Sequence, residues 1–379
     1  MSSPDCDVAP TATRHRAPAA PVVDARGAAV TFGLEEEFVL LQPRTLSTVD
    51  VGLEAVAELR GSVPGAVMRE FFPSQIEYAT PVCRTVDDAL LAVSGFRARL
   101  SAWAEAAGVV VAPSGTPFAT DGRAPQLEGR YAAIAQDIAG LTAEHQLNGL
   151  HVHVGIADRD AGVRASNFLR PWLPVLLALS ANSPFWQGRD TGFASWRAIH
   201  SRRWTTHGIP PHFDDAAEYD RAVRRLGGIG ATSDAGTINW VARLSATHPT
   251  LEVRVCDVPL DPHSSVALAA LIRGLVAVGA ERGAPRPERF EGWDAALWHA
   301  ARHGTASTLV DPVTGRLVPA AGVLESLVAL VRPRLPGADL RVIECFLAEH
   351  AVHGGGAAQQ RRAHARGRLV ALYRDRIAG

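Results

Sequence analysis

Residues 31–41 read TFGLEEEFVLL, an apolar strand pattern that three consecutive glutamates interrupt. Side chains on a β-strand alternate between its two faces, so Glu35 and Glu37 share one face while Glu36 points to the other. The apolar neighbours indicate a strand inside a core, where an unpaired charge is costly to bury. The face that carries Glu35 and Glu37 therefore needs water, a metal ion or other charged groups against it.

Two other strand patterns repeat this arrangement. In GLHVHVG, His151 and His153 share a face of the strand, and in LEVRV, Glu252 and Arg254 share one. A further strand pattern, QIEYAT, contributes Glu77. Each pair alone also fits a solvated strand face, a structural histidine pair or a cross-strand ion pair. Three such strands in one sheet would form a polar, acidic floor, and carboxylates are the ligands that Mg²⁺ prefers, with imidazole tolerated by Mn²⁺. Spacing alone leaves these alternatives open.

The rest of the chain alternates irregularly between helix and strand patterns. Residues 85–108 have helical spacing with a threonine N-cap, and residues 129–147 predict a second helix. A long apolar helix in ASNFLRPWLPVLLALSANSPF is broken by Pro171 and Pro174. After Ser264 the pattern is helical, with one loop at DPVTGRLVP. These patterns predict an α+β fold with a largely antiparallel sheet flanked by helices.

Composition sets further bounds. The chain has 379 residues, 47% of them hydrophobic, and a formal net charge of −1, so we expect a sizeable core and no nucleic acid or membrane partner. Residues 1–28 read as a flexible tail without a secretory signal, and residues 29–379 as a single domain. No apolar run approaches the roughly 20 residues of a membrane span. The four cysteines are scattered, which is typical of reduced thiols in a cytoplasmic protein.

The chain contains no lysine, so its basic residues are all arginine. A P-loop needs a lysine on the phosphates, and Schiff-base chemistry needs a lysine amine. Both classes are excluded. Any phosphate would be bound by arginine, backbone N–H groups or a metal ion.

These motifs, taken in order, resemble a known family. FGLEEEFVLLQP, QIEYATPVCRTVDD, GLHVHVGIAD, LPVLLALSANSPFWQGRDTGFASWR, TLEVRVCDVP, AARHGTASTLVDP and GGGAAQQR are similar to the motifs of the type 2 glutamate–cysteine ligases, also called carboxylate–amine ligases. The resemblance spans roughly residues 31–370. It implies the fold of the glutamine synthetase-like superfamily, an antiparallel sheet with metals bound in a funnel above it.

The resemblance also implies roles for individual residues. The metal ligands it implies are Glu35, Glu37, Glu77, His151 and Glu252. Arg254 would bind the transferring phosphoryl group, which makes Arg254, Glu252 and Glu35 the expected catalytic residues. His153 would contact ATP or substrate rather than metal. Further arginines in segments that resemble nucleotide and substrate loops are Arg130, Arg197 and Arg243.

The implied reaction joins a carboxylic acid to an amine at the expense of ATP, with Mg²⁺ or Mn²⁺ as the metal. An acyl phosphate would be the intermediate, and the default substrates would be glutamate and cysteine. The chain departs from the family where Thr116 is followed directly by Pro117, without an intervening histidine, and where Leu244 follows Arg243 in place of proline. These departures bear on the substrates. A homodimer is implied. The alternatives are a non-catalytic homologue that binds a nucleotide or an amino acid, and a metal-dependent amide hydrolase.

Overall fold

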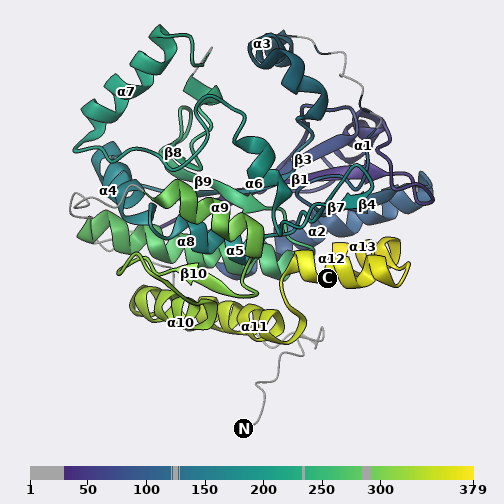
Figure 1. The fold of residues 1–379 in the computed structure, drawn as a ribbon. Coiled ribbons are helices and arrows are strands. Elements are labelled where there is room, and N and C mark those ends of the chain that lie inside the picture. The colour runs from purple at the N-terminus through teal and green to yellow at the C-terminus, as the bar shows by residue number, and fades with distance from the viewer. Residues whose placement is uncertain (1–29, 121, 123–126, 128, 233–234, 284–291) are drawn as a thin grey trace.

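The computed structural model describes residues 30–379 except 121, 123–126, 128, 233–234 and 284–291 (Figure 1). The expected tail over residues 1–28 lies outside this part of the chain. The division into that tail and a single domain over 29–379 stays a prediction.

The fold is built on a seven-stranded sheet in the order β2-β3-β1-β5-β9-β8, with β4 pairing the end of β1. Every neighbouring pair is antiparallel. The strands are β1 (Phe32–Leu41), β2 (Ala66–Arg69), β3 (Gln75–Ala79), β4 (Val110–Ala112), β5 (Gly149–Gly155), β8 (Ala242–Leu244) and β9 (Thr250–Asp257). The predicted α+β class with an antiparallel sheet and flanking helices is confirmed.

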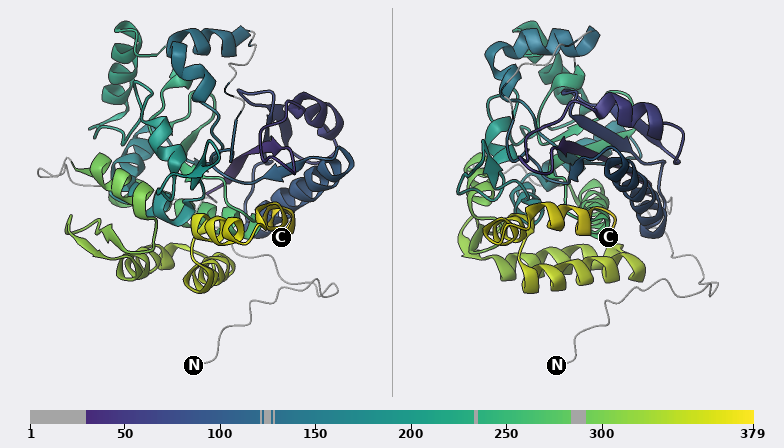
Figure 2. Two further views of the ribbon diagram at one scale, coloured as in Figure 1. Left: turned by 45° about the vertical axis from the view of Figure 1, so that its right-hand side comes forward. Right: turned by 90° about the vertical axis from the view of Figure 1, so that its right-hand side faces the viewer.

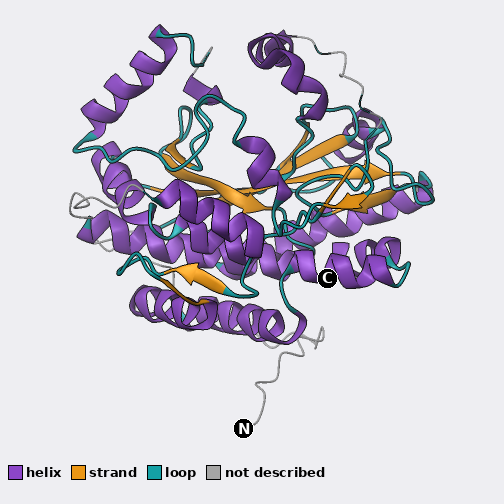
Figure 3. Cartoon of the chain, in the orientation of Figure 1, coloured by secondary structure: helices purple, strands orange, loops and turns teal. Residues whose placement is uncertain are grey.

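One face of the sheet packs on helices (Figure 3). Apolar side chains that alternate with the polar pairs, such as Leu34, Val152 and Val253, are fully buried in the main core. The helices of this layer are α2 (Val86–Ala106), α4 (Arg159–Leu169), α5 (Leu173–Ser180), α8 (Pro262–Arg282) and α9 (Trp293–His303). A further layer lies beyond them, formed by α10 (Ala320–Val331) and α11 (Gly337–His353), with α12 (Gly356–Ala365) and α13 (Leu369–Ile377) beside it (Figure 2).

The opposite face of the sheet is only partly covered. In Figure 1, α3 (Gly129–Ile138) and α7 (Ala216–Gly228) rise above this face at opposite sides, and α6 (Trp196–Ser201) lies between them. The short remaining elements are α1 (Gly52–Leu59), the pair β6 (Phe185–Trp186) and β7 (Arg189–Asp190), and the 3₁₀ turns η1 (Ala139–Glu144), η2 (Ala235–Thr237) and η3 (Arg332–Arg334). The polar residue pairs point to this less covered face.

The local predictions differ in their outcome. The helix expected over 85–108 is α2, and Thr85 forms a capping box with Asp88 at its start. The helix expected over 129–147 ends early, because Ala139 takes a positive φ of 46° and the chain continues as the 3₁₀ turn η1. The loop expected at DPVTGRLVP contains strand β11 (Leu317–Pro319), which pairs with β10 (Thr308–Val310). These two strands have three residues each, too few for a periodic pattern.

Pro171 separates α4 from α5 as expected. Pro174 instead lies in the first turn of α5, where its missing N–H leaves no hydrogen bond unmade. We expected no apolar run as long as a membrane span, but helix α8 is long and apolar enough to cross a membrane by length and composition. In this structure 83% of its apolar window is buried inside the fold, as in the core helix of a globular domain.

Candidate active site

The polar residues of the strand patterns face one another across the sheet. Residues directly opposite on neighbouring antiparallel strands have side chains close enough to interact. The opposed pairs are Glu37 with Glu77, Glu35 with His151, His153 with Glu252, and Arg243 with Glu252. The hydrogen-bond register of β3, β1, β5, β9 and β8 thus turns separate i, i+2 patterns into one continuous polar row.

This row is the floor of a cavity of about 660 Å³. Above the floor, Phe71, Tyr131, His145 and Trp204 contribute to one wall, and residues 235–239 and 245–248 to another. We call it the acidic cavity, because Glu35, Glu37, Glu70, Glu77 and Glu252 all line it. Its size is that of a small-molecule site.

Three side chains in the acidic cavity are placed as metal ligands would be. One ligand atom from each of Glu35, His153 and Glu252 lies within 4.8 Å of the other two. His153 Nε2 lies 3.3 Å from Glu35 Oε1. Beside this group, His151 lies between two carboxylates, with Nδ1 3.3 Å from Glu35 Oε2 and Nε2 3.7 Å from Glu37 Oε1. The geometry therefore groups His153, rather than His151, with Glu35 and Glu252.

The carboxylates fall into two sets by their pKa values. Burial raises the pKa of Glu35, but hydrogen bonds with His151 and His153 outweigh it and hold that pKa well below its usual range. Burial also raises the pKa of Glu252, and the charges of Arg254 and Arg243 reverse this effect and lower it. Both groups are ionised at neutral pH.

The second set is Glu37, Glu70 and Glu77. Burial and the charge of Glu70 raise the pKa of Glu37 to about 8. Burial and three neighbouring carboxylates raise that of Glu77 well above its usual value, and burial raises that of Glu70. These carboxyl groups repel one another and have too little positive charge nearby. A divalent cation would remove this repulsion, so the site's chemistry fits a bound metal ion.

Strand β9 carries a β-bulge at this point. Arg254 and Val255 stand opposite the single residue His151, because the pairing with β5 shifts between Leu150 and Val152. Arg254 forms an ion pair with Glu252, and its Nη1 lies 3.3 Å from His151 Nδ1. Burial and the charge of Arg254 lower the pKa of His151 to about 4, so this imidazole is neutral.

The other predicted arginines lie in different places. Arg243 donates to Glu252 at 2.8 Å and to the backbone carbonyl oxygens of Gly236 and Ile238, so it holds η2 and the following residues against the sheet. Arg130 lies in α3, and its side chain is outside the described part of the chain.

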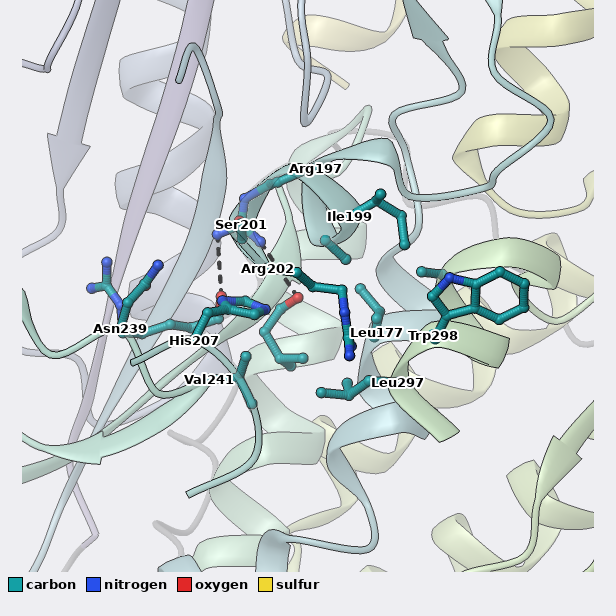
Figure 4. A pocket seen from close by; sticks show the side chains of 14 residues that line it. Leu177, Arg197, Ile199, Ser201, Arg202, His207, Asn239, Val241, Leu297 and Trp298 are labelled. Atoms are coloured by element: carbon teal, nitrogen blue, oxygen red, sulfur yellow. Dashed lines mark hydrogen bonds between the residues drawn. The ribbon is translucent and has the colours of Figure 1, made fainter. Parts of the chain in front are cut away.

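Arg197 does not line the acidic cavity. It donates to the backbone carbonyl oxygens of both bulge residues, Arg254 at 3.2 Å and Val255 at 3.5 Å (Figure 4). It packs on Gly149, where a Cβ atom would come within 2.4 Å of its Nη2. The N–H group of Gly149 in turn donates to Glu37 Oε2 at 2.6 Å. Glycine at this position lets the Arg197 guanidinium occupy the place of a side chain, while the N–H of the same residue binds Glu37.

Glu70 is the main site residue that the sequence analysis missed. It follows β2, a four-residue strand with one buried side chain, which gives almost no periodic pattern. Tyr131 donates to Glu70 Oε2 at 3.2 Å, and Trp204 Nε1 contacts the His145 ring at 3.0 Å. The signal in the sequence was Met68–Phe72, which begins in β2 and is followed by Pro73 and Ser74 before β3, a pattern that predicts a hairpin.

Known proteins resemble this chain over most of its length. The family model described as glutamate-cysteine ligase family 2 matches residues 31–375. A relative in Saccharopolyspora erythraea that carries the provisional name glutamate–cysteine ligase 2-2 is 39% identical over 348 residues, 89% of each chain. One in Rhodococcus jostii, provisionally named glutamate–cysteine ligase 2-1, is 37% identical over 362 residues, 93% of this chain and 97% of its own.

Two solved structures share the fold. The glutamate–cysteine ligase of Francisella tularensis, determined in complex with AMP, has a TM-score of 0.69 at 12% identity over 95% of this chain and 89% of its own. The bifunctional glutathione synthetase of Pasteurella multocida has a TM-score of 0.68 at 15% identity over 92% of this chain and 52% of its own. At such low identity these likenesses concern the fold alone.

Proposed function

The chain belongs to glutamate–cysteine ligase family 2, and from this premise we propose that it joins a carboxylic acid to an amine in a reaction driven by ATP and dependent on Mg²⁺. Family membership makes it an amide-forming carbon–nitrogen ligase. The nucleotide, the metal and the intermediate are the finer parts of the proposal. We propose a cytoplasmic enzyme with glutamate and cysteine as default substrates, and a homodimer stays a prediction.

One observation carries the proposal: the polar row of the sheet supplies two sets of carboxylates to one cavity. Glu35, His153 and Glu252 would hold one metal ion. Glu37 and Glu77, which face each other at the other end of the row, would hold a second with Glu70. His151 lies between the two sets and would serve either. Bound Mg²⁺ would neutralise charge on the phosphates of ATP.

The chain's own residues would do the rest of the work. The substrate carboxylate attacks the γ-phosphorus of ATP and displaces ADP, which gives an acyl phosphate. The amine then attacks the acyl carbon and expels phosphate. Arg254, held by Glu252 at the bulge, would place its guanidinium against the transferring phosphoryl group, because its planar fork matches phosphate oxygens. The aromatic wall of Phe71, Tyr131 and Trp204 would limit access of water to the acyl phosphate.

Product analysis tests this proposal. Purified protein is incubated with ATP, Mg²⁺, glutamate and cysteine, and then with a panel of other acids and amines. We expect ADP and phosphate in equal amounts with the amide, only when acid, amine and metal are all present. AMP with pyrophosphate would contradict the acyl-phosphate mechanism. Amide hydrolysis without ATP would favour the hydrolase, and ATP binding without turnover across the panel would favour the non-catalytic homologue.

A further inference from the structure

A second, much smaller cavity lies where α6, α9 and β9 meet (Figure 4). Its volume is about 20 Å³, enough for one water-sized group. Three guanidinium groups line it, from Arg197, Arg202 and Arg254, together with the imidazole of His207. Arg254 and Asn239 line the acidic cavity as well, so the two cavities adjoin. We call the small cavity the basic recess.

The basic recess is lined by three arginines and, among the described residues, by no aspartate or glutamate. Arg254 pairs with Glu252, but Glu252 is shared with Arg243. Arg197 Nη1 lies 3.8 Å from Asp257, whose oxygens already accept hydrogen bonds from one N–H and two hydroxyl groups. Glu252 and Asp257 are thus shared among Arg254, Arg243 and Arg197. Arg202 adds a further positive charge at the recess.

That third arginine, Arg202, has an exposed side chain and donates to the backbone carbonyl oxygen of Asp294 at 3.2 Å. Among the described residues, its hydrogen-bond acceptor is this backbone oxygen and not a carboxylate. Two buried nitrogen atoms at the recess, His207 Nδ1 and Arg254 Nε, also have no hydrogen-bond partner among the described residues. Buried polar atoms in folded proteins nearly always have partners, so these two point to a missing ligand.

His207 is uncharged in this setting. Burial and the charges of Arg197 and Arg202 lower its pKa to about 3. A neutral imidazole keeps one N–H donor, and the guanidinium groups around it are donors only. The recess therefore offers donors and positive charge but no ionised acceptor of its own. Leu297 and Trp298 form an apolar wall, which strengthens electrostatic interactions inside.

We propose that the basic recess binds a carboxylate group of an amino-acid substrate, other than the carboxylate that reacts, and that His207 and Arg202 determine specificity for it. A carboxylate is planar, accepts two hydrogen bonds side by side, and carries the single negative charge that the recess lacks. One carboxylate oxygen fits the present space, and the exposed Arg202 side chain would have to shift to admit the second. The inference rests on the proposed ligase function, because it assigns this group to a ligase substrate.

The consequence is a preference that can be measured. A substrate that lacks the carboxylate that takes no part in the reaction, such as 4-aminobutyrate in place of glutamate or cysteamine in place of cysteine, should be used poorly. A hydrogen bond to a charged group corresponds to roughly a 10- to 100-fold change in affinity. The pair that shows this difference tells which of the two substrates places its carboxylate in the recess.

The experiment compares His207→Leu and Arg202→Met with the wild type and with two matched controls on exposed residues, His263→Leu and Arg99→Met. ADP release gives KM and kcat for each carboxylated substrate and its decarboxylated partner. We expect both test variants to raise KM for the carboxylated substrate about 10- to 100-fold, with little effect on KM for the partner. The controls should keep the wild-type ratio. An unchanged ratio in both test variants would overturn the proposal.

A binding measurement separates this inference from the proposed function. Titration calorimetry without nucleotide gives Kd for glutamate, 4-aminobutyrate, cysteine and cysteamine. Binding that needs the non-reacting carboxylate and is lost in both test variants would support the recess even if no pair of substrates turned over. Turnover to ADP with equal use of carboxylated and decarboxylated substrates would support the ligase and refute the recess.

Discussion

The two faces of strand β1 bury consecutive glutamates in opposite ways. Glu36 is fully buried among helices, where Arg97 of α2 donates to both of its carboxylate oxygens and Ser265 of α8 adds a third hydrogen bond. Arg97 donates its other hydrogens to the backbone carbonyl oxygens at residues 259 and 260. The charge of Glu36 is therefore neutralised by a side chain of the protein itself.

Glu35 and Glu37 point to the other face and meet a different environment. Glu35 contacts two histidines, and Glu37 faces another glutamate, Glu77, across the strand pair. On this face, acids outnumber the bases that could neutralise them, and burial keeps water from screening the repulsion. A buried carboxylate that is fully paired is costly to unpair and so has a structural role, whereas a buried set that is not fully paired is a candidate for binding a ligand.

The largest expected effect is on catalysis, at the metal side of the strand. Glu35→Gln keeps the shape of the side chain but removes the charge from the group of Glu35, His153 and Glu252. We expect turnover to fall by at least about a thousandfold, on the order of 4 kcal/mol of transition-state stabilisation. The free energy of unfolding without metal should fall by about 1–2 kcal/mol, because the ionised carboxylate interacts with His151 and His153 in the folded protein. ADP release and urea denaturation measure the two quantities.

Glu54→Gln, on the exposed face of α1, is the matched control and should change neither. Full activity in Glu35→Gln would remove this residue from the metal site. A large loss of stability would instead show that Glu35, like Glu36, has a structural role.

The second prediction concerns the helix-covered face of β1, where a substitution should lower stability and leave metal binding intact. Arg97→Met leaves Glu36 as an uncompensated buried charge, since both side chains have zero exposure. Breaking a buried ion pair in this way costs about 3–5 kcal/mol of unfolding free energy. The fraction of protein that remains folded should keep its Kd for Mn²⁺, measured by calorimetry at low temperature. The neighbouring exposed Arg99→Met should change stability by less than about 0.5 kcal/mol. A stability loss no larger than that of the control would refute the comparison of the two faces.

The sequence supported some parts of this comparison and not others. Alternation along a strand predicts that Glu35 and Glu37 share a face opposite Glu36, because that period is a property of the backbone. It does not predict Arg97 as the partner of Glu36, since α2 brings that arginine from 61 residues away. Which face is structural thus depends on helix packing, which a strand pattern does not contain.

The site shows the same limit. The i, i+2 pairs were visible, but their register depends on inter-strand hydrogen bonds and on the bulge at Arg254 and Val255. That register groups His153 with Glu35 and Glu252. The metal and phosphate roles of these residues, predicted from the family resemblance, remain predictions.

The third prediction concerns Glu37 and depends on pH. Its pKa is raised from 4.5 to about 8 in the folded protein, so between these values the folded state holds a proton that the unfolded state has released. Stability from this group is therefore highest below pH 4.5 and falls as pH rises toward 8, by at most about 1.4 kcal/mol per pH unit. Glu37→Gln mimics the protonated carboxyl group and should lose less stability than the wild type between pH 5 and pH 8, as urea denaturation without metal would show.

Saturating Mg²⁺ should reverse the wild-type trend, because metal binding displaces the proton and becomes tighter as pH rises. Equal pH slopes in wild type and variant would mean that Glu37 is already ionised and paired, and the acidic face would then resemble the face of Glu36.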